Sequence, residues 1–392
     1  MRGMQALCCL LLFALTGCDF FVANSSGGGG SVTGDYIYVG NSSNTDIAGF
    51  GVSTAGALSV LSGSPYNNGI AALSLTVTPA NTFLYVGTSN GIYGYSLATN
   101  GSISVLNSGT VLAQDVIPTH MQVDSTGNYL IAAGLGTSTA AQTIGIYTIN
   151  TSTGIVTAVS GSPLALYTGS GTTPTLLTPT GLLITPNNSY VYVSLGALGV
   201  QLLTLGADGA LSAGSSPTYL PPKSTSTSPV DYGLASDPNS AFLFVAETNT
   251  GLRVLSIGTN GTLNELSGSP YAVGTGPRGV ALDTTGSYVY VANFGSNNIS
   301  AFTLTAASGK LTAVSGSPFS SGGQNPLAFV NDNQKKYLAV INNGNNGSTG
   351  VSDLQLFSFD TTIDGKLDPV STATTGTDPT NPQAIAATAV AQ

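Results

Sequence analysis

Only a few side chains at repeated positions of this chain can take part in acid–base chemistry or hold a charge. Its 392 residues include 17 Asp or Glu, 8 Lys or Arg and a single histidine, His120. An imidazole can take a proton from water, a guanidinium can stabilise a negative charge that develops in a reaction, and a carboxylate can orient either group. His120, Arg278 and Glu247 supply one group of each kind. What they can do together depends on the strands that carry them.

The three residues belong to a unit that recurs about every 40 to 60 residues. The unit opens with a strand-like segment, which occurs seven times as YIYVGN, FLYVGT, YLIAAG, YVYVSL, FLFVAE, YVYVAN and YLAVIN. A second segment follows, and then a turn with glycine where a hairpin needs a positive φ, often as Asn-Gly or Asp-Gly. A third segment leads into SGSP or a degraded version of it, and a fourth ends in a polar turn. Each unit therefore predicts four short antiparallel strands.

Seven such units predict an all-β fold, a seven-bladed β-propeller of four-stranded antiparallel blades that spans residues 35–392. A linear solenoid would need capping units, and the sequence has none. Because neighbouring blades cover both faces of each sheet, the strands can be apolar on both sides, which agrees with 6% charged and 42% hydrophobic residues. The last inner-strand sequence, NPQAIAATAV at 381–390, lacks three partners. We expect this C-terminal strand to join the N-terminal strands and close the ring.

This architecture predicts where the three residues lie. Because successive strands are antiparallel, the loop before each inner strand and the loop after each second strand open on the same face, which we expect to hold any site. The inner strands, aligned on PRGVALD, give a first channel ring of Leu73, Thr119, Thr180, Tyr232, Arg278, Leu327 and Gln383. They give a second channel ring of Ser74, His120, Gly181, Gly233, Gly279, Ala328 and Ala384. The segments aligned on YVYVAN give a strand-end ring of Asn41, Thr88, Gly134, Leu195, Glu247, Asn293 and Asn342.

Two segments, GTGPRGVALDTTGSYVYVANFGSNNISAFTL and IPTHMQVDSTGNYL, resemble the seven-bladed lactonase family, which includes 6-phosphogluconolactonase-like proteins and the muconate-lactone cyclases. The resemblance covers about residues 35 to 390. It implies a lactone hydrolase in which His120 acts as general base on water, Arg278 stabilises the developing oxyanion and Glu247 orients or relays. The ligand would be a small-molecule lactone or another carbohydrate-derived molecule.

The sequence departs from the family at two positions. In the family the GPR segment is typically followed by His, and the next second strand often ends in a loop carrying Glu. Gly279 stands at the first position here, and Asn293 and Phe294 stand at the second. We therefore expect a propeller that binds a small molecule or partner with weak or no catalysis. The alternatives are a hydrolase of uncharged lactones and, third, a structural or adhesive repeat protein.

A structural interpretation of the same residues also stays open. In it, His120 forms a hydrogen bond at the start of a strand, and Arg278 and Glu247 are solvated loop charges. Arg253, on the strand-like segment GLRVLSI, is expected to pair with a nearby acid.

The N-terminus predicts export and a lipid anchor. A basic residue and an apolar run of roughly ten residues form a signal peptide over 1–17, because so short a run cannot span a membrane. The following LTGC resembles the lipobox of bacterial lipoproteins, which implies that Cys18 carries the lipid; the alternative is an ordinary buried cysteine. The Gly/Ser-rich residues 18–34 read as a flexible tether. We expect a monomer held at the membrane of the cell envelope by this anchor.

Charge and composition argue against several other partners. The net charge of −9 disfavours nucleic acid and binding to anionic lipid through basic patches. Asp360, Asp364 and Asp368 lie close together in DTTIDGKLD, but the segment occupies a hairpin turn of the repeat and lacks the EF-hand spacing. The sequence contains no Cys/His metal motif, phosphate loop or nucleophile elbow. We therefore expect no metal and no cofactor.

Overall fold

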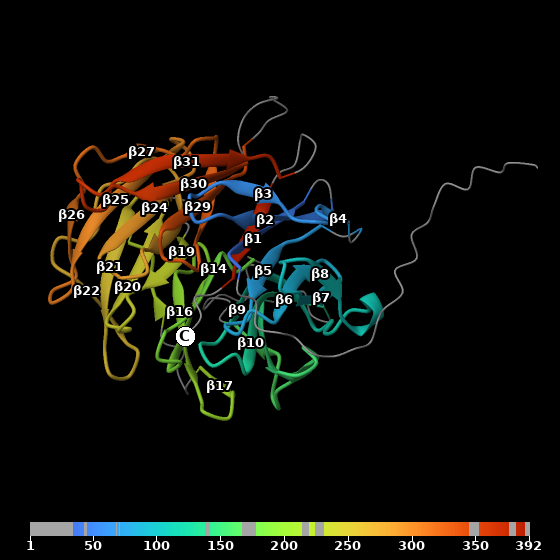
Figure 1. Cartoon of the computed structure of the whole chain (residues 1–392). Coiled ribbons are helices and arrows are strands. Elements are labelled where there is room, and N and C mark those ends of the chain that lie inside the picture. The colour runs from blue at the N-terminus through green and yellow to red at the C-terminus, as the bar shows by residue number, and fades with distance from the viewer. Residues whose placement is uncertain are drawn as a thin grey trace, which may run out of the picture.

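The computed structural model of the chain describes residues 34–42, 45–67, 69, 71–137, 142–166, 178–213, 219–223, 231–344, 353–375 and 382–388. These residues form seven antiparallel sheets arranged in a ring (Figure 1). The predicted all-β, seven-bladed propeller is confirmed. In this part of the chain no helix is long and apolar enough to cross a membrane. Cys18 and the predicted signal peptide lie outside the described residues.

Each blade runs from an inner strand beside the channel to an outer strand at the rim. The inner strands are β5 (Ser74–Val77), β9 (Val116–Val123), β14 (Gly181–Ile184), β19 (Asp231–Ser236), β23 (Pro277–Leu282), β28 (Pro326–Asn331) and β32 (Pro382–Ala387). The second strands are β1 (Tyr36–Asn41), β6 (Phe83–Thr88), β10 (Tyr129–Gly136), β15 (Tyr190–Ser194), β20 (Phe242–Glu247), β24 (Tyr288–Asn293) and β29 (Tyr337–Asn342). Inner and second strands pair antiparallel in every blade.

The two outer positions of each blade complete the sheets. The third strands are β2 (Asp46–Val52), β7 (Gly91–Leu97), β11 (Gln142–Ile149), β16 (Val200–Leu205), β21 (Gly251–Ile257), β25 (Asn298–Thr305) and β30 (Leu354–Phe359). The outer strands are β3 (Leu58–Val60), β8 (Ile103–Val105), β12 (Val156–Ala158), β17 (Leu211–Ser212), β22 (Leu263–Glu265), β26 (Lys310–Ala313) and β31 (Leu367–Ala373). Short strands β4 (Tyr66–Asn67), β13 (Leu164–Ala165), β18 (Tyr219–Leu220) and β27 (Phe319–Ser320) pair with the third strands of their blades.

The ring closes as the sequence predicts. Strand β32, at the C-terminus, pairs with β1, so that one blade consists of β32, β1, β2 and β3. Each inner strand contacts the next around the channel, in the order β5, β9, β14, β19, β23, β28, β32 and back to β5. In Figure 1 the blue N-terminal strands accordingly lie beside the red C-terminal ones. This closure fixes every inner strand between two neighbours.

Aromatic residues of the second strands join each blade to the next. Tyr192 donates a hydrogen bond of 2.6 Å to the carbonyl of Gly261, in the outer hairpin turn of the following blade. Gly261 has a φ of 78°, and a Cβ on it would lie 2.6 Å from the ring of Tyr190. Only glycine meets both demands. Tyr38, Tyr85 and Tyr290 make equivalent bonds. These aromatic side chains are therefore core residues that join neighbouring blades.

Candidate functional site

Five of the seven inner strands carry a β-bulge at the first channel ring. In β9 the register passes from Ala133 opposite His120 to Gly134 opposite Pro118, which leaves Thr119 as the extra residue. Four further inner strands, β19, β23, β28 and β32, shift register at the corresponding residues. A bulge bends its strand and changes the direction of the side chains beside it. Bulges thus set the positions of both His120 and Arg278 at this end of the channel, which we call the bulged end.

His120 is held between two inner strands. Its Nδ1 lies 3.2 Å from the hydroxyl of Thr119, which in turn lies 3.2 Å from the carbonyl oxygen of Pro179, just before the inner strand of the next blade. Burial lowers the pKa of the imidazole to about 4, although a hydrogen bond with the Pro179 carbonyl partly opposes this effect. The lowered pKa favours the neutral imidazole at pH 7 and makes it a weaker general base.

Arg278 stacks on an aromatic ring of its own blade. Its guanidinium carbon Cζ lies 3.6 Å from the centroid of the Phe294 ring, a cation–π contact. Phe294 follows the second strand β24 and occupies the region where the sequence comparison with the family expects an acid. Arg278 is half-buried, and the contact with Phe294 positions its guanidinium at the bulged end. The sequence did not indicate this contact, because aligning the repeats places residues along the strands but does not show where their side chains point.

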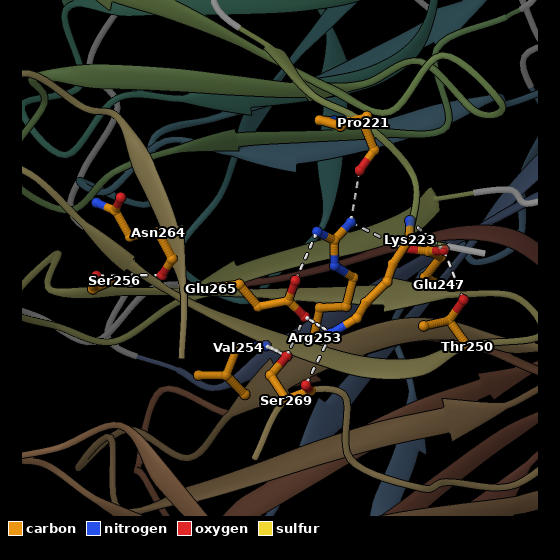
Figure 2. A network of polar contacts seen from close by, with 10 residues as sticks. All are labelled: Pro221, Lys223, Glu247, Thr250, Arg253, Val254, Ser256, Asn264, Glu265 and Ser269. Atoms are coloured by element: carbon orange, nitrogen blue, oxygen red, sulfur yellow. Dashed lines mark hydrogen bonds and ion pairs between the residues drawn. The ribbon is translucent and has the colours of Figure 1, made fainter. Parts of the chain in front are cut away.

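Glu247 is not a solvated loop charge; that interpretation is wrong. The side chain is fully buried at the end of β20. Its carboxylate accepts hydrogen bonds from the Lys223 backbone N–H at 3.0 Å and the Thr250 hydroxyl at 2.7 Å, and it pairs with Arg253 Nη1 at 3.1 Å (Figure 2). A charge this deep requires such partners, because an unpaired buried carboxylate is very unfavourable. The last residue of the second strand therefore turns its side chain into the protein.

Arg253 is the centre of this network, which joins two blades. Its Nη2 lies 3.3 Å from Glu265, and Nη1 donates to the Pro221 carbonyl at 3.0 Å. Lys223 Nζ also lies 2.9 Å from Glu265. Burial raises the pKa of Glu265, but the Lys223, Ser269 and Arg253 contacts outweigh it and lower the pKa overall. Pro221 and Lys223 follow β18, which belongs to the preceding blade, so the network connects that blade to the blade of β20 (Figure 2). The expected pairing of Arg253 with an acid is confirmed.

The structure brings the three predicted residues to one end of the propeller but on three different blades. In the ring of inner strands, β14 and β19 lie between β9, which carries His120, and β23, which carries Arg278. Glu247 lies at the same end of the propeller, because it pairs with Asp231, the first residue of the inner strand β19. His120 and Arg278 therefore lie on inner strands that are not neighbours in the ring.

The acidic turn considered for Ca²⁺ holds an ammonium group. Lys366 Nζ lies 2.7 Å from Asp360 and 2.6 Å from Asp368. The lysine occupies the space between the two carboxylates that a cation would take. Among the described residues, no three His, Cys, Asp or Glu side chains are placed to share a metal ion.

Comparison with known proteins supports the lactonase-family fold. The family model described as a lactonase with a 7-bladed β-propeller matches residues 179–318. This range contains Glu247 and Arg278 but not His120. No curated protein sequence matches the chain.

Solved structures share the whole propeller. A Lactobacillus plantarum protein is 20% identical with a TM-score of 0.67, over 90% of this chain and 99% of its own. A Bacteroides fragilis protein provisionally assigned as a 6-phosphogluconolactonase is 18% identical with a TM-score of 0.68, over 90% and 98% of the two chains. The periplasmic gluconolactonase PpgL of Pseudomonas aeruginosa is 18% identical with a TM-score of 0.66, over 91% and 99%. At these identities the likeness shows a common fold.

Proposed function

We propose that this chain is an exported, lipid-anchored member of the seven-bladed lactonase family that binds a small uncharged molecule at the bulged end, with weak or no catalysis. The observation that carries the proposal is the buried ion pair of Glu247 with Arg253. In addition, two inner strands lie between those that carry His120 and Arg278, and burial lowers the pKa of His120 to about 4. The one histidine of the chain is thus poorly suited to activate water beside the arginine at neutral pH.

The remaining groups favour binding over turnover. Glu247 is committed to Arg253, Thr250 and the Lys223 backbone, so its carboxylate already has the partners that a buried charge needs. Arg278 offers a fixed positive charge beside the face of Phe294. A carbonyl oxygen of an uncharged ligand can accept a hydrogen bond from a guanidinium, and a ring can pack on the same surface. These features suit a lactone or a related carbohydrate-derived molecule as a ligand.

Calorimetry with a panel of uncharged sugar lactones, combined with turnover measurements on the same panel, tests this proposal. Saturable binding that weakens at least tenfold in Arg278→Ala, without hydrolysis above background, supports it. The titration of the imidazole provides a second test, since NMR of the untagged chain shows one histidine. A His120 pKa at or above the usual 6.5 would contradict the argument against a general base.

A lactone hydrolase acting on an uncharged lactone is the second candidate. The fold shared with PpgL, named a periplasmic gluconolactonase, favours it. In that case hydrolysis of an uncharged lactone should disappear in His120→Ala while binding persists. A structural or adhesive repeat protein is the third candidate, and the absence of saturable binding and of turnover with every lactone would favour it.

A further inference from the structure

A cavity lies at the opposite end of the channel from His120 and Arg278. Its volume is about 470 Å³, and it is lined where the inner strands β9, β14, β19, β23 and β28 end and turn toward the second strands. We call it the end cavity. Small-molecule sites in proteins commonly have volumes of about 300 to 1,000 Å³. The end cavity is therefore large enough for a ligand, and it shares no lining residue with the bulged end.

The walls of the end cavity are mainly apolar. Leu183, Leu234, Ala281 and Phe329 each come from a different inner strand. No Lys, Arg or His is among the lining residues, and Asp283 is their one carboxylate. That carboxylate already accepts hydrogen bonds from backbone N–H groups of the turn that follows β23. An anion would find no positive partner here, so the lining favours an uncharged molecule.

Two amide side chains, Gln122 and Asn331, lie on the first and last of these inner strands, and each makes one hydrogen bond within the protein. Gln122 on β9 accepts a bond of 2.8 Å from the N–H of Ile184 through Oε1. Asn331 on β28 donates one of 2.8 Å to the carbonyl of Leu282 through Nδ2. Among the described residues, Asn331 Oδ1 is buried without a partner, whereas Gln122 is partly exposed and can donate through Nε2. Buried polar atoms normally find partners, so Asn331 Oδ1 points to a ligand or water.

We propose that the end cavity binds a small, uncharged, largely apolar molecule that carries a carbonyl or hydroxyl group. A carbonyl can accept a hydrogen bond from Gln122 Nε2, and a hydroxyl can donate one to Asn331 Oδ1. The apolar body then packs against the walls formed by Leu183, Leu234 and Phe329. This site is separate from the one at the bulged end and does not depend on it.

Fluorescence titration with Prodan, an uncharged naphthalene ketone, tests the proposal on the full chain. We expect saturable binding that falls at least tenfold in Ala281→Trp, since the indole fills the cavity. Ala307→Trp makes the same change at an exposed turn residue and should bind as the unaltered chain does. A sulfonated naphthalene probe should bind at least tenfold more weakly than Prodan. The proposal is wrong if Prodan does not saturate, if folded Ala281→Trp binds normally, or if the sulfonate binds equally well.

A gentler substitution covers the case in which Ala281→Trp fails to fold. Ser236 lines the cavity and is partly exposed, and the native cysteines all lie within residues 1–18. In Ser236→Cys, labelling of position 236 by N-ethylmaleimide can be followed by peptide mass. Saturating Prodan should slow that labelling at least fivefold. An unchanged labelling rate would overturn the proposal independently of the tryptophan variant.

Discussion

The backbone N–H of Tyr36 donates a hydrogen bond of 3.0 Å to the hydroxyl of Thr388, although 352 residues separate them in the chain. The N–H of Thr388 returns a bond of 2.9 Å to the Tyr36 carbonyl. In a blade built from contiguous chain, Thr185 makes the same pair of bonds with Tyr190, at 3.0 and 2.9 Å. The two ends of the chain thus reproduce, without a covalent link, the turn that joins inner and second strands elsewhere.

Removing the C-terminal strand should destabilise the propeller severely. Deleting residues 381–392 takes away β32, so that β1 loses one of its two partners and β5 and β28 each lose a neighbour. Exposed strand edges also promote aggregation. We expect a large fall in melting temperature and in solubility. Deletion of residues 19–33, which lie before the described propeller, is the control, and equal melting temperatures for the two truncations would refute the importance of closure.

The stability of the closing blade should depend on pH through Asp35. Burial, with a contribution from the nearby Asp332, raises the pKa of Asp35 from 3.8 to about 7. The folded state therefore binds a proton more tightly than the unfolded state. By linkage, this group favours folding below pH 4, and its contribution is lost as the pH rises to about 7. Urea unfolding between pH 4 and 7 should show a weaker decline for Asp35→Asn, and parallel curves would contradict this assignment.

Removing Arg253 alone should lower the free energy of unfolding more than removing the charges of both Arg253 and Glu247. Arg253→Met leaves a fully buried carboxylate without its main cation, and such changes destabilise proteins by about 3 to 5 kcal/mol. The double variant Arg253→Met with Glu247→Gln removes both charges and should recover part of that loss. Denaturant unfolding measures both. If the double variant is less stable than Arg253→Met alone, then Glu247 stabilises the fold through its hydrogen bonds as well as by balancing the charge of Arg253.

A phosphorylated sugar lactone should be a poor substrate. A phosphate carries about two negative charges, and binding it normally takes several Arg or Lys groups or the N-terminus of a helix. Arg278 is the one basic residue in the three rings, and the net charge of −9 opposes the approach of an anion. Assays with 6-phosphogluconolactone should therefore give turnover near background. Efficient turnover that Arg278→Ala abolishes would show that a family activity persists.

Cys18 should be needed for membrane attachment. In Cys18→Ala the thiol that would carry the lipid is missing, so we expect an unlipidated precursor that stays uncleaved or is mislocalised. Detergent phase partitioning and intact mass report both effects. Unchanged partitioning and mass would show that the chain is not a lipoprotein.

The blades and their closure could be predicted from the sequence because every unit repeats the same local signals. Glycines of the seven outer turns adopt a positive φ, as at Gly365 with 80°, and the C-terminal strand expected within 381–390 is observed as β32 (Pro382–Ala387). The directions of the site residues could not be predicted. A bulge breaks the two-residue alternation, so the side on which Arg278 and His120 face cannot be counted along the strand. The partners of Glu247 come from separate segments, and a single sequence does not pair them.

The contact between Thr388 and Tyr36 also determines what the chain order means in this fold. Inner-to-second turns such as that from Asp283 to Tyr288 use the same hydrogen bonds as the junction of the two ends. A circular permutant opened at that turn and joined through a short linker after Thr388 would keep the pairing of every strand. The break in the backbone would then lie at the Asp283–Tyr288 turn and no longer between Thr388 and Tyr36. The seven blades are therefore equivalent in topology, and the fold does not require the chain to begin at β1.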